Sequence, residues 1–163
     1  MDFNSTILRL PHVAKLIFED LNRIQMRNCS KVCKAWREFL ERSKFYWVKL
    51  TKDQPGWKKL PSLVDFETFV SLGKAFEEID KFGGRTKRRK IHPCFCAIQM
   101  NDLKLFKKLI WEYADDDCDY KCSCNNVSLV TKSMSGWSLF DFARDIGRNR
   151  ILRYMLKKDP PGP

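Results

Sequence analysis

The sequence predicts an all-α protein, and three observations support this fold class. Four stretches carry apolar residues at the spacings of three and four that are typical of amphipathic helices. No stretch alternates apolar and polar residues for long enough to predict a strand. Hydrophobic residues make up 44% and aromatic residues 13% of the 163 residues, which is enough to build a core. The four helical stretches are residues 10–50, 62–82, 92–114 and 138–157.

The first stretch should form three short helices, at roughly 11–21, 25–33 and 35–43. Pro11 fits the first turn of the first helix, because the N–H that proline lacks has no helical partner there. Residues 51–61 hold two prolines and a glycine, which is typical of a connection.

The helix predicted at 62–82 is capped by Ser62 or Asp65, since both side chains can accept a bond from the first free N–H groups. Gly83 and Gly84 end it. The run at 85–90 has no apolar face and is expected to be a linker, and the polar segment 115–135 is expected to be a loop.

Charge and cysteine content indicate the cellular compartment and the kinds of partner to expect. The net charge is +11, with 10 basic and 5 acidic residues in 1–50, 10 and 6 in 51–91, and 11 and 9 in 92–163. The positive electrostatic field of such a charge attracts an acidic protein partner as well as nucleic acid. The N-terminal residues lack a secretory leader pattern, so we expect the protein in the cytoplasm or nucleus, with free thiols among its seven cysteines. No apolar run approaches the ~20 residues that span a bilayer, so we expect no membrane partner.

Residues 10–50 carry a recognisable set of residues. They are Leu10-Pro11, Val13, Ile17-Phe18, Leu21, Asn28-Cys29-Ser30-Lys31-Val32-Cys33-Lys34, Trp36-Arg37, Trp47 and Leu50. Through these residues the segment resembles the F-box, and the resemblance implies that it docks on a Skp-family adaptor and, through it, on a cullin. By resemblance the adaptor interface comprises Leu10, Pro11, Val13, Ile17, Leu21, Met26, Val32 and Cys33, and the F-box core contains Trp36, Leu40 and Trp47.

The two C-terminal stretches align with each other. The aligned pattern comprises Pro93, Ala97, Leu103, Phe106, Leu109, Ile110, Ala114 and Asp115 in the first stretch, and Gly136, Ser138, Ala143, Gly147, Ile151, Leu152, Met155 and Leu156 in the second. Through these residues both stretches resemble degenerate ankyrin repeats. Their offset is 139 − 93 = 46 residues, longer than the ~33 of a regular repeat. Two repeats are fewer than the ~3 usually needed to stand alone, so we expect the helix at 62–82 to pack on the first repeat as a cap. The resemblance implies a substrate-binding face containing Phe95, Asp117, Tyr120 and Trp137.

Other chemistry receives less support from the sequence. Cys94, Cys96, Cys118, Cys122 and Cys124 invite a zinc hypothesis, but Cys96 falls where a repeat helix needs a small buried residue, so no metal and no cofactor are expected. No nucleophile–base–acid set is suggested. The basic run Arg85, Lys87, Arg88, Arg89 and Lys90 is a candidate nuclear import signal, although a solvated linker has the same composition.

The sequence thus predicts an F-box at 1–50, a connecting helix and basic linker at 51–91, and two ankyrin-like hairpins at 92–163. The predicted function is a non-catalytic substrate adaptor of a Skp–cullin–F-box ubiquitin ligase, whose target is an unidentified protein. One alternative is a basic nuclear protein that binds nucleic acid, and another is an F-box-fold scaffold outside the ubiquitin system. We do not expect nucleic acid as a partner, because no aromatic residues interleave the basic run.

Overall fold

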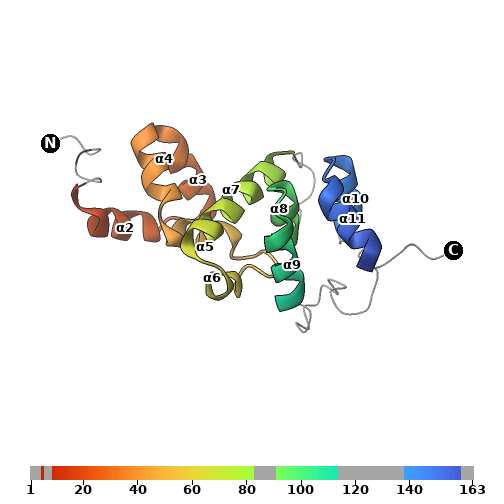
Figure 1. The fold of residues 1–163 in the computed structure, drawn as a ribbon. Helices are drawn as coiled ribbons and strands as arrows, with labels where there is room; N and C mark the ends of the chain where they lie inside the picture. The colour runs from red at the N-terminus through yellow and green to blue at the C-terminus, as the bar shows by residue number, and fades with distance from the viewer. Residues whose placement is uncertain (1–4, 6–8, 83–90, 114–137, 159–163) are drawn as a thin grey trace. The chain divides into compact units, whose positions relative to one another are not determined.

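The chain packs into two compact units, Met1–Asp53 and Gln54–Pro163, and each is described by itself. The computed structural model describes residues 5, 9–82, 91–113 and 138–158. Every regular element in these residues is an α-helix (Figure 1), so the predicted all-α class is confirmed. None of the described helices is both long and apolar enough to cross a membrane.

Within the described residues, the N-terminal unit holds the helices α2 (Pro11–Glu19), α3 (Arg23–Val32), α4 (Lys34–Glu41) and α5 (Lys44–Thr51). The first three agree with the predicted helices within two residues at each end, and α5 was not predicted. A reciprocal capping box begins α3. The Asn22 side chain accepts hydrogen bonds from the backbone N–H groups of Ile24 and Gln25, and the Gln25 side chain accepts one from the Asn22 N–H.

An aromatic cluster joins α2 to α4 in the core of this unit. The buried Phe18 ring of α2 meets Trp36 edge-on at 5.3 Å between centroids and lies 5.8 Å from Phe39. Leu40 and Trp47 are fully buried, and the Trp47 indole N–H donates to the Glu41 carbonyl oxygen at 2.8 Å. Trp36 is half-buried and packs against Phe18.

The C-terminal unit contains α6 (Leu60–Leu63), α7 (Phe66–Phe82), α8 (Pro93–Gln99), α9 (Leu103–Glu112), α10 (Leu139–Asp145) and α11 (Asn149–Lys158). The Asp65 carboxylate caps α7 by accepting from the Thr68 N–H at 2.8 Å and the Thr68 hydroxyl at 2.9 Å. These bonds favour the ionised form and lower the pKa of Asp65. As expected, α7 packs against α8.

The segment before α6 is an integral part of this unit rather than a simple connection. The Trp57 indole N–H donates to the Ile91 carbonyl oxygen at 2.8 Å, and the Ile91 N–H donates to the Gln54 side-chain oxygen at 2.8 Å. The Tyr113 hydroxyl donates to the Gly56 carbonyl oxygen at 2.6 Å. Residues 54–57 thus form a strap that holds the start of the α8/α9 hairpin and the end of α9.

The two hairpins, α8/α9 and α10/α11, repeat one local structure. In each hairpin, one residue of the turn has left-handed backbone. The N–H of the next residue donates to the carbonyl oxygen of a buried alanine five residues earlier in the chain. The first set is Ala97, Asn101 (φ 57°) and Asp102, and the second is Ala143, Gly147 (φ 69°) and Arg148. The offset is again 147 − 101 = 46 residues. Whether these hairpins are ankyrin repeats stays a prediction.

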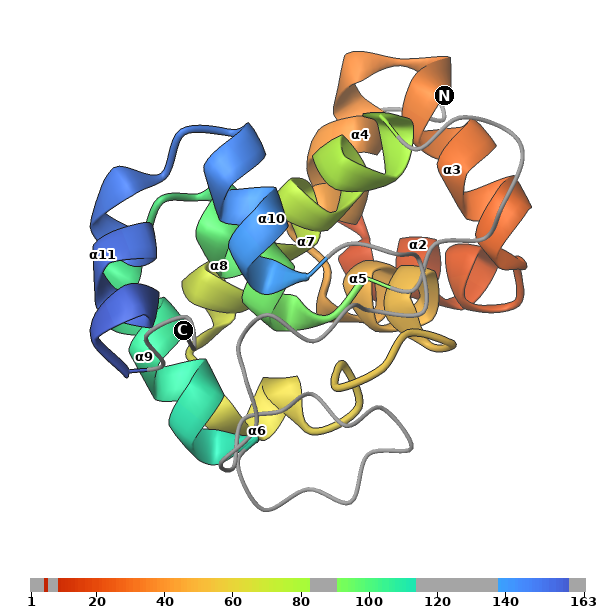
Figure 2. The same ribbon diagram turned by 90° about the vertical axis from the view of Figure 1, so that its right-hand side faces the viewer.

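An aromatic contact and a hydrogen bond join the hairpins. The rings of Phe95 on α8 and Phe142 on α10 meet edge-on at 5.5 Å, and the Arg148 guanidinium donates to the Gln99 carbonyl oxygen at 2.8 Å. Figure 2 shows α8 beside α10. Phe95, which was predicted to lie in the substrate-binding face, is 8% exposed and packs between the hairpins, and its role in binding stays a prediction.

Gly56→Ala should destabilise the C-terminal unit more than the matched variant Gly147→Ala. Both glycines have positive φ, +78° and +69°, so each alanine strains the backbone by about 1–2 kcal/mol. A Cβ at position 56 would also lie 2.5 Å from Nε2 of the buried His92, whereas one at 147 meets nothing within 4 Å. Urea unfolding followed by circular dichroism should show a total loss of about 3 kcal/mol or more for Gly56→Ala. Equal losses in the two variants would contradict the strap.

Candidate functional site: an apolar docking face

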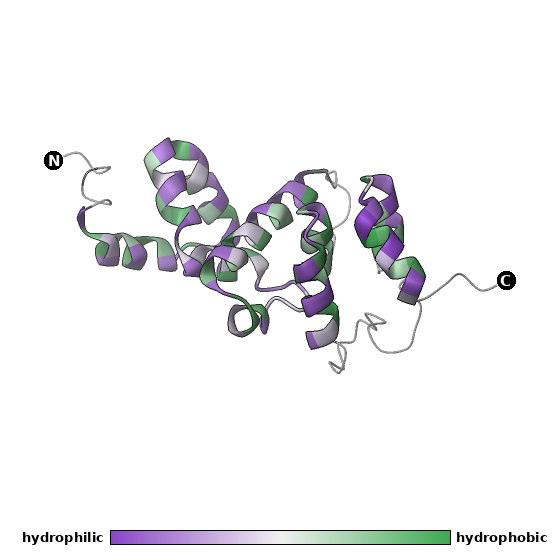
Figure 3. Ribbon diagram, viewed as in Figure 1, coloured by the Kyte–Doolittle hydropathy of each residue, from purple (hydrophilic) through white to green (hydrophobic). Residues whose placement is uncertain are grey.

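Exposed apolar side chains gather on the N-terminal unit. Among the described residues, six of the nine exposed large hydrophobic side chains belong to it, although it is the smaller unit. They are Leu10, Leu16, Ile17, Ile24, Val32 and Val48. Figure 3 shows the underlying pattern, in which hydrophobic and hydrophilic bands alternate along these helices. A monomer gains nothing from keeping such side chains in water, so this surface is the candidate site for a partner.

Helix α2 has two faces with different roles. Ala14 and Phe18 are buried against the rest of the unit. Val13 and Ile17, four residues apart, share a neighbouring face, where Ile17 is 45% exposed and Val13 half-buried. Leu10 precedes the helix and is 43% exposed. The helix therefore presents an apolar row outside the core that its own unit does not cover.

The junction between α3 and α4 exposes another apolar side chain of this unit. Cys33 has extended backbone, with φ −157° and ψ 168°, and it separates the two helices by a single residue. This sharp turn leaves Val32 64% exposed at the end of α3. Pro11 is exposed, and Leu21 and Cys33 are half-buried, so seven of the eight residues predicted for the adaptor interface retain some exposed surface.

Met26 is the exception among the predicted interface residues. Its side chain is 0% exposed, because it points from α3 into the core of the unit. A partner cannot touch it in this conformation. Met26 therefore supports the docking face from beneath, and the expectation that it forms part of that face needs this correction.

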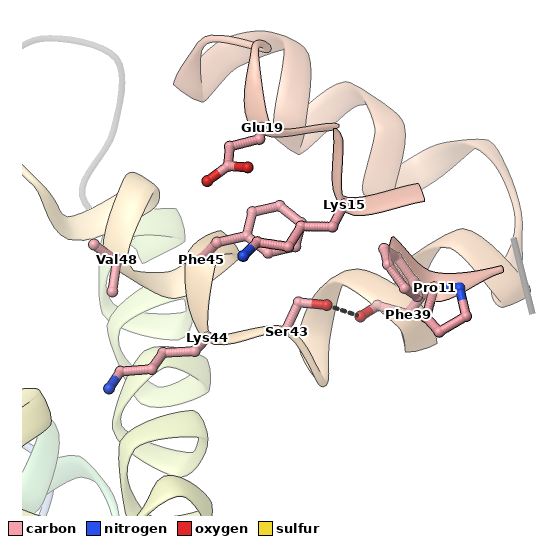
Figure 4. Close-up of a pocket in the computed structure, with 8 residues that line it drawn as sticks. All are labelled: Pro11, Lys15, Glu19, Phe39, Ser43, Lys44, Phe45 and Val48. Atoms are coloured by element: carbon pink, nitrogen blue, oxygen red, sulfur yellow. Dashed lines mark hydrogen bonds between the residues drawn. The ribbon is translucent and has the colours of Figure 1, made fainter. Parts of the chain in front are cut away.

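A hollow of about 480 Å³ lies beside α2, between that helix and the start of α5. Figure 4 shows its lining, with Pro11, Lys15 and Glu19 contributed by α2. The other lining residues are Phe39, Ser43, Lys44, Phe45 and Val48. The Ser43 hydroxyl donates to the Phe39 carbonyl oxygen at 2.7 Å, and the Lys49 ammonium donates to the Glu19 carbonyl oxygen. The hollow is open to solvent, and both charged and aromatic side chains line it. It therefore continues the exposed surface of α2 and does not form an enclosed ligand site.

The remaining predicted site residues lie outside the described part of the chain. These are Asp117, Tyr120 and Trp137 of the predicted substrate-binding face, and Arg85, Lys87, Arg88, Arg89 and Lys90 of the basic run. Cys118, Cys122 and Cys124 of the zinc hypothesis lie there too. Within the described residues, no three His, Cys, Asp or Glu side chains converge as metal ligands.

The sequence analysis missed two exposed apolar residues of the N-terminal unit. Leu16 and Ile24, which are 66% and 71% exposed, were not among the predicted interface residues. Ile24 sits in the first turn of α3, where the capping box fixes the backbone and turns the side chain outward. An apolar residue between polar neighbours at a helix start is the signal that could have found it.

Comparison with known families now assigns the N-terminal unit to a class. The model described as the F-box domain matches residues 7–48, which span α2, α3, α4 and most of α5. The predicted F-box is therefore confirmed, and it covers 48 − 7 + 1 = 42 of the 163 residues. F-box domains generally bind a Skp-family adaptor. Searches of curated proteins and of solved structures found no match.

Alkylation of the native protein should separate its described cysteines into two classes. Cys29 and Cys33 are half-buried, whereas Cys94 and Cys96 are fully buried, and all four are free thiols. Burial raises the pKa of the Cys96 thiol well above its ordinary value and also raises the pKa of Cys29. Time-resolved peptide mass spectrometry with iodoacetamide should show Cys29 and Cys33 reacting at least ~10-fold faster than Cys94 and Cys96.

Unfolding in urea provides the control for this measurement. Since the thiolates are then equally solvated, the four rates should converge. If Cys96 reacts in the native state as fast as Cys33, the packing of α8 described above is incorrect.

Proposed function

We propose that this protein is the substrate adaptor of a Skp–cullin–F-box ubiquitin ligase. It docks on a Skp-family adaptor through the apolar face of the N-terminal unit, and through that adaptor it joins a cullin. The observation that carries the proposal is the coincidence of two findings. The F-box match covers 7–48, and the same segment holds six of the nine exposed large hydrophobic side chains of the described residues.

Burial of apolar surface supplies the energy for this docking. Each square ångström of apolar surface removed from water contributes about 25 cal/mol, and a partner that covers Leu10, Ile17 and Val32 removes surface the free unit leaves in water. The excess of basic over acidic residues in 1–50 favours an acidic partner and raises the rate of encounter.

The C-terminal unit then holds the target protein. The adaptor needs no catalytic residue of its own, because it acts by proximity, keeping a lysine of the target near the charged ubiquitin-conjugating enzyme. Its place of action is the cytoplasm, the nucleus or both. The helical hairpins suit this role, since paired helices on a rigid scaffold present side chains in fixed positions.

The double substitution Ile17→Asp with Val32→Asp should abolish docking while leaving the fold intact. Both side chains are exposed, 45% and 64%, so the cost to stability should stay near 0.5 kcal/mol each, roughly that of other surface changes. In the complex each carboxylate would lose its water without gaining a partner, which should weaken binding at least ~100-fold. Co-expression with a Skp-family adaptor and purification on one tag measures the effect.

The matched control is Trp111→Asp with Leu156→Asp, which places two carboxylates on exposed apolar positions of the C-terminal unit. This control should co-purify with the adaptor as the wild type does. The proposal fails if the Ile17 and Val32 variant still co-purifies at the wild-type level, or if the wild type does not co-purify at all.

A further inference from the structure

The outer side of α9 is a basic surface with one exposed aromatic residue at its end. Lys104, Lys107, Lys108 and Trp111 are spaced at three and four residues, so they lie on one face of the helix. The opposite face, which includes Leu105, Phe106 and Leu109, is buried. Trp111 is 79% exposed, the highest value among the described large hydrophobic residues.

Helix α11 has a similar outer face. Arg150, Arg153 and Lys157 are exposed, and Leu156 beside them is 40% exposed. Ile151 and Met155 face the other way and are buried. The exposed side of α11 is therefore basic, with an apolar residue among the cations.

One tyrosine joins the two faces into a single surface. Tyr154 of α11 packs edge-on against Phe106 of α9, with ring centroids 6.4 Å apart. The ammonium of Lys107 lies 4.7 Å from the Tyr154 ring centroid, which is within cation–π range. Figure 2 shows α9 and α11 on the same side of the C-terminal unit. We name this joined surface, formed by Lys104, Lys107, Lys108, Trp111, Arg150, Arg153, Tyr154, Leu156 and Lys157, the outer basic face.

The charge on the outer basic face is largely uncompensated within the described residues. Helix α9 carries three lysines and one acidic residue, Glu112, and α11 carries four basic residues and no acidic one. Lys104, Arg150 and Arg153 form no ion pair with any carboxylate in the described residues. A surface with this field attracts a ligand of opposite charge.

We infer that the outer basic face binds an acidic segment of the target protein, with Trp111 and Leu156 receiving apolar side chains of that segment. The inference deepens the proposed function, on which it rests, by naming the chemistry of the substrate. Arginine and tryptophan are the residues that most often dominate binding energy in protein interfaces. Carboxylates of the target satisfy the cations, and its apolar side chains cover the two exposed apolar residues.

The same surface suits nucleic acid less well. Proteins that bind single strands stack successive bases on several open aromatic rings. Here Trp111 is the one open ring, because Tyr154 already lies against Phe106 and beneath Lys107. Leu156 cannot stack with a base, whereas it fits an apolar side chain. A protein segment therefore explains more of the surface.

Fluorescence anisotropy with the full chain tests the inference. The probe is a short fluorescein-labelled peptide in which Asp and Glu alternate with Leu and Phe. The test variant is Lys104→Glu with Arg150→Glu and Arg153→Glu, all exposed positions with no described ion pair. Its affinity should fall about tenfold or more, and Trp111→Ala should weaken binding several-fold at unchanged charge.

The matched control carries the same change of charge elsewhere: Lys52→Glu, Lys58→Glu and Lys81→Glu, three exposed lysines outside the outer basic face. It should bind the peptide within about threefold of wild type, because only non-local charge has changed. All variants should still co-purify with the Skp-family adaptor, which separates failure of this inference from failure of the proposed function.

Three results would overturn the inference. One is that wild type does not bind the acidic peptide. Another is that the control loses as much affinity as the test variant, which would indicate attraction by net charge alone. The third is that a labelled oligothymidine binds more tightly than the peptide and loses affinity in the test variant, which would make the face a nucleic-acid surface.

Discussion

The burial of Phe18 is the interaction on which the N-terminal unit depends. Its ring is the main contact that α2 makes with the aromatic side chains of α4, and only Ala14 accompanies it into the core. Because so narrow a part of α2 is used internally, Leu10 and Ile17 remain in water. These exposed side chains are the surface that the proposed docking on a partner would cover. A wider buried face on α2 would strengthen the unit and remove the docking surface.

The C-terminal unit is also built from helices, but its helices differ in how deeply they are buried. The inner helix α8 is buried from Pro93 to Ile98, whereas α10 buries only Leu139, Phe142 and Ala143. The rings of Phe95 and Phe142 close the contact between the hairpins. Helix α8 packs on both α7 and α10, and the outer helices α9 and α11 each keep an exposed face. The difference in burial explains why α8 is rich in apolar residues, whereas basic residues are concentrated on α9 and α11.

Local patterns predicted much of the fold, and distant contacts explain where prediction failed. The helices α2, α3, α4 and α7 follow from apolar spacing and caps such as Asp65, which act within four residues. Helix α5 was missed because apolar and aromatic side chains surround it, as in Phe45 to Val48, so no single face stands out. The sequence could not reveal that Phe95 meets Phe142, 47 residues away, or that Trp57 bonds to Ile91, 34 residues away. The F-box pattern predicted an adaptor interface on α2, which stays a prediction, whereas the burial of Met26 depends on how α3 packs in three dimensions.

The strap at 54–57 has a consequence for cooperativity. Its bonds join Gln54 and Trp57 to Ile91, and Gly56 to Tyr113 at the end of α9. Opening the α8/α9 hairpin therefore requires breaking contacts with a segment that lies before α6 and α7. The hairpin cannot fray independently of the helices that precede it, so amide exchange at Ile91 should follow global rather than local unfolding of the unit. A fragment that began at α8 would lose this coupling and would expose the indole-binding side of the hairpin to water.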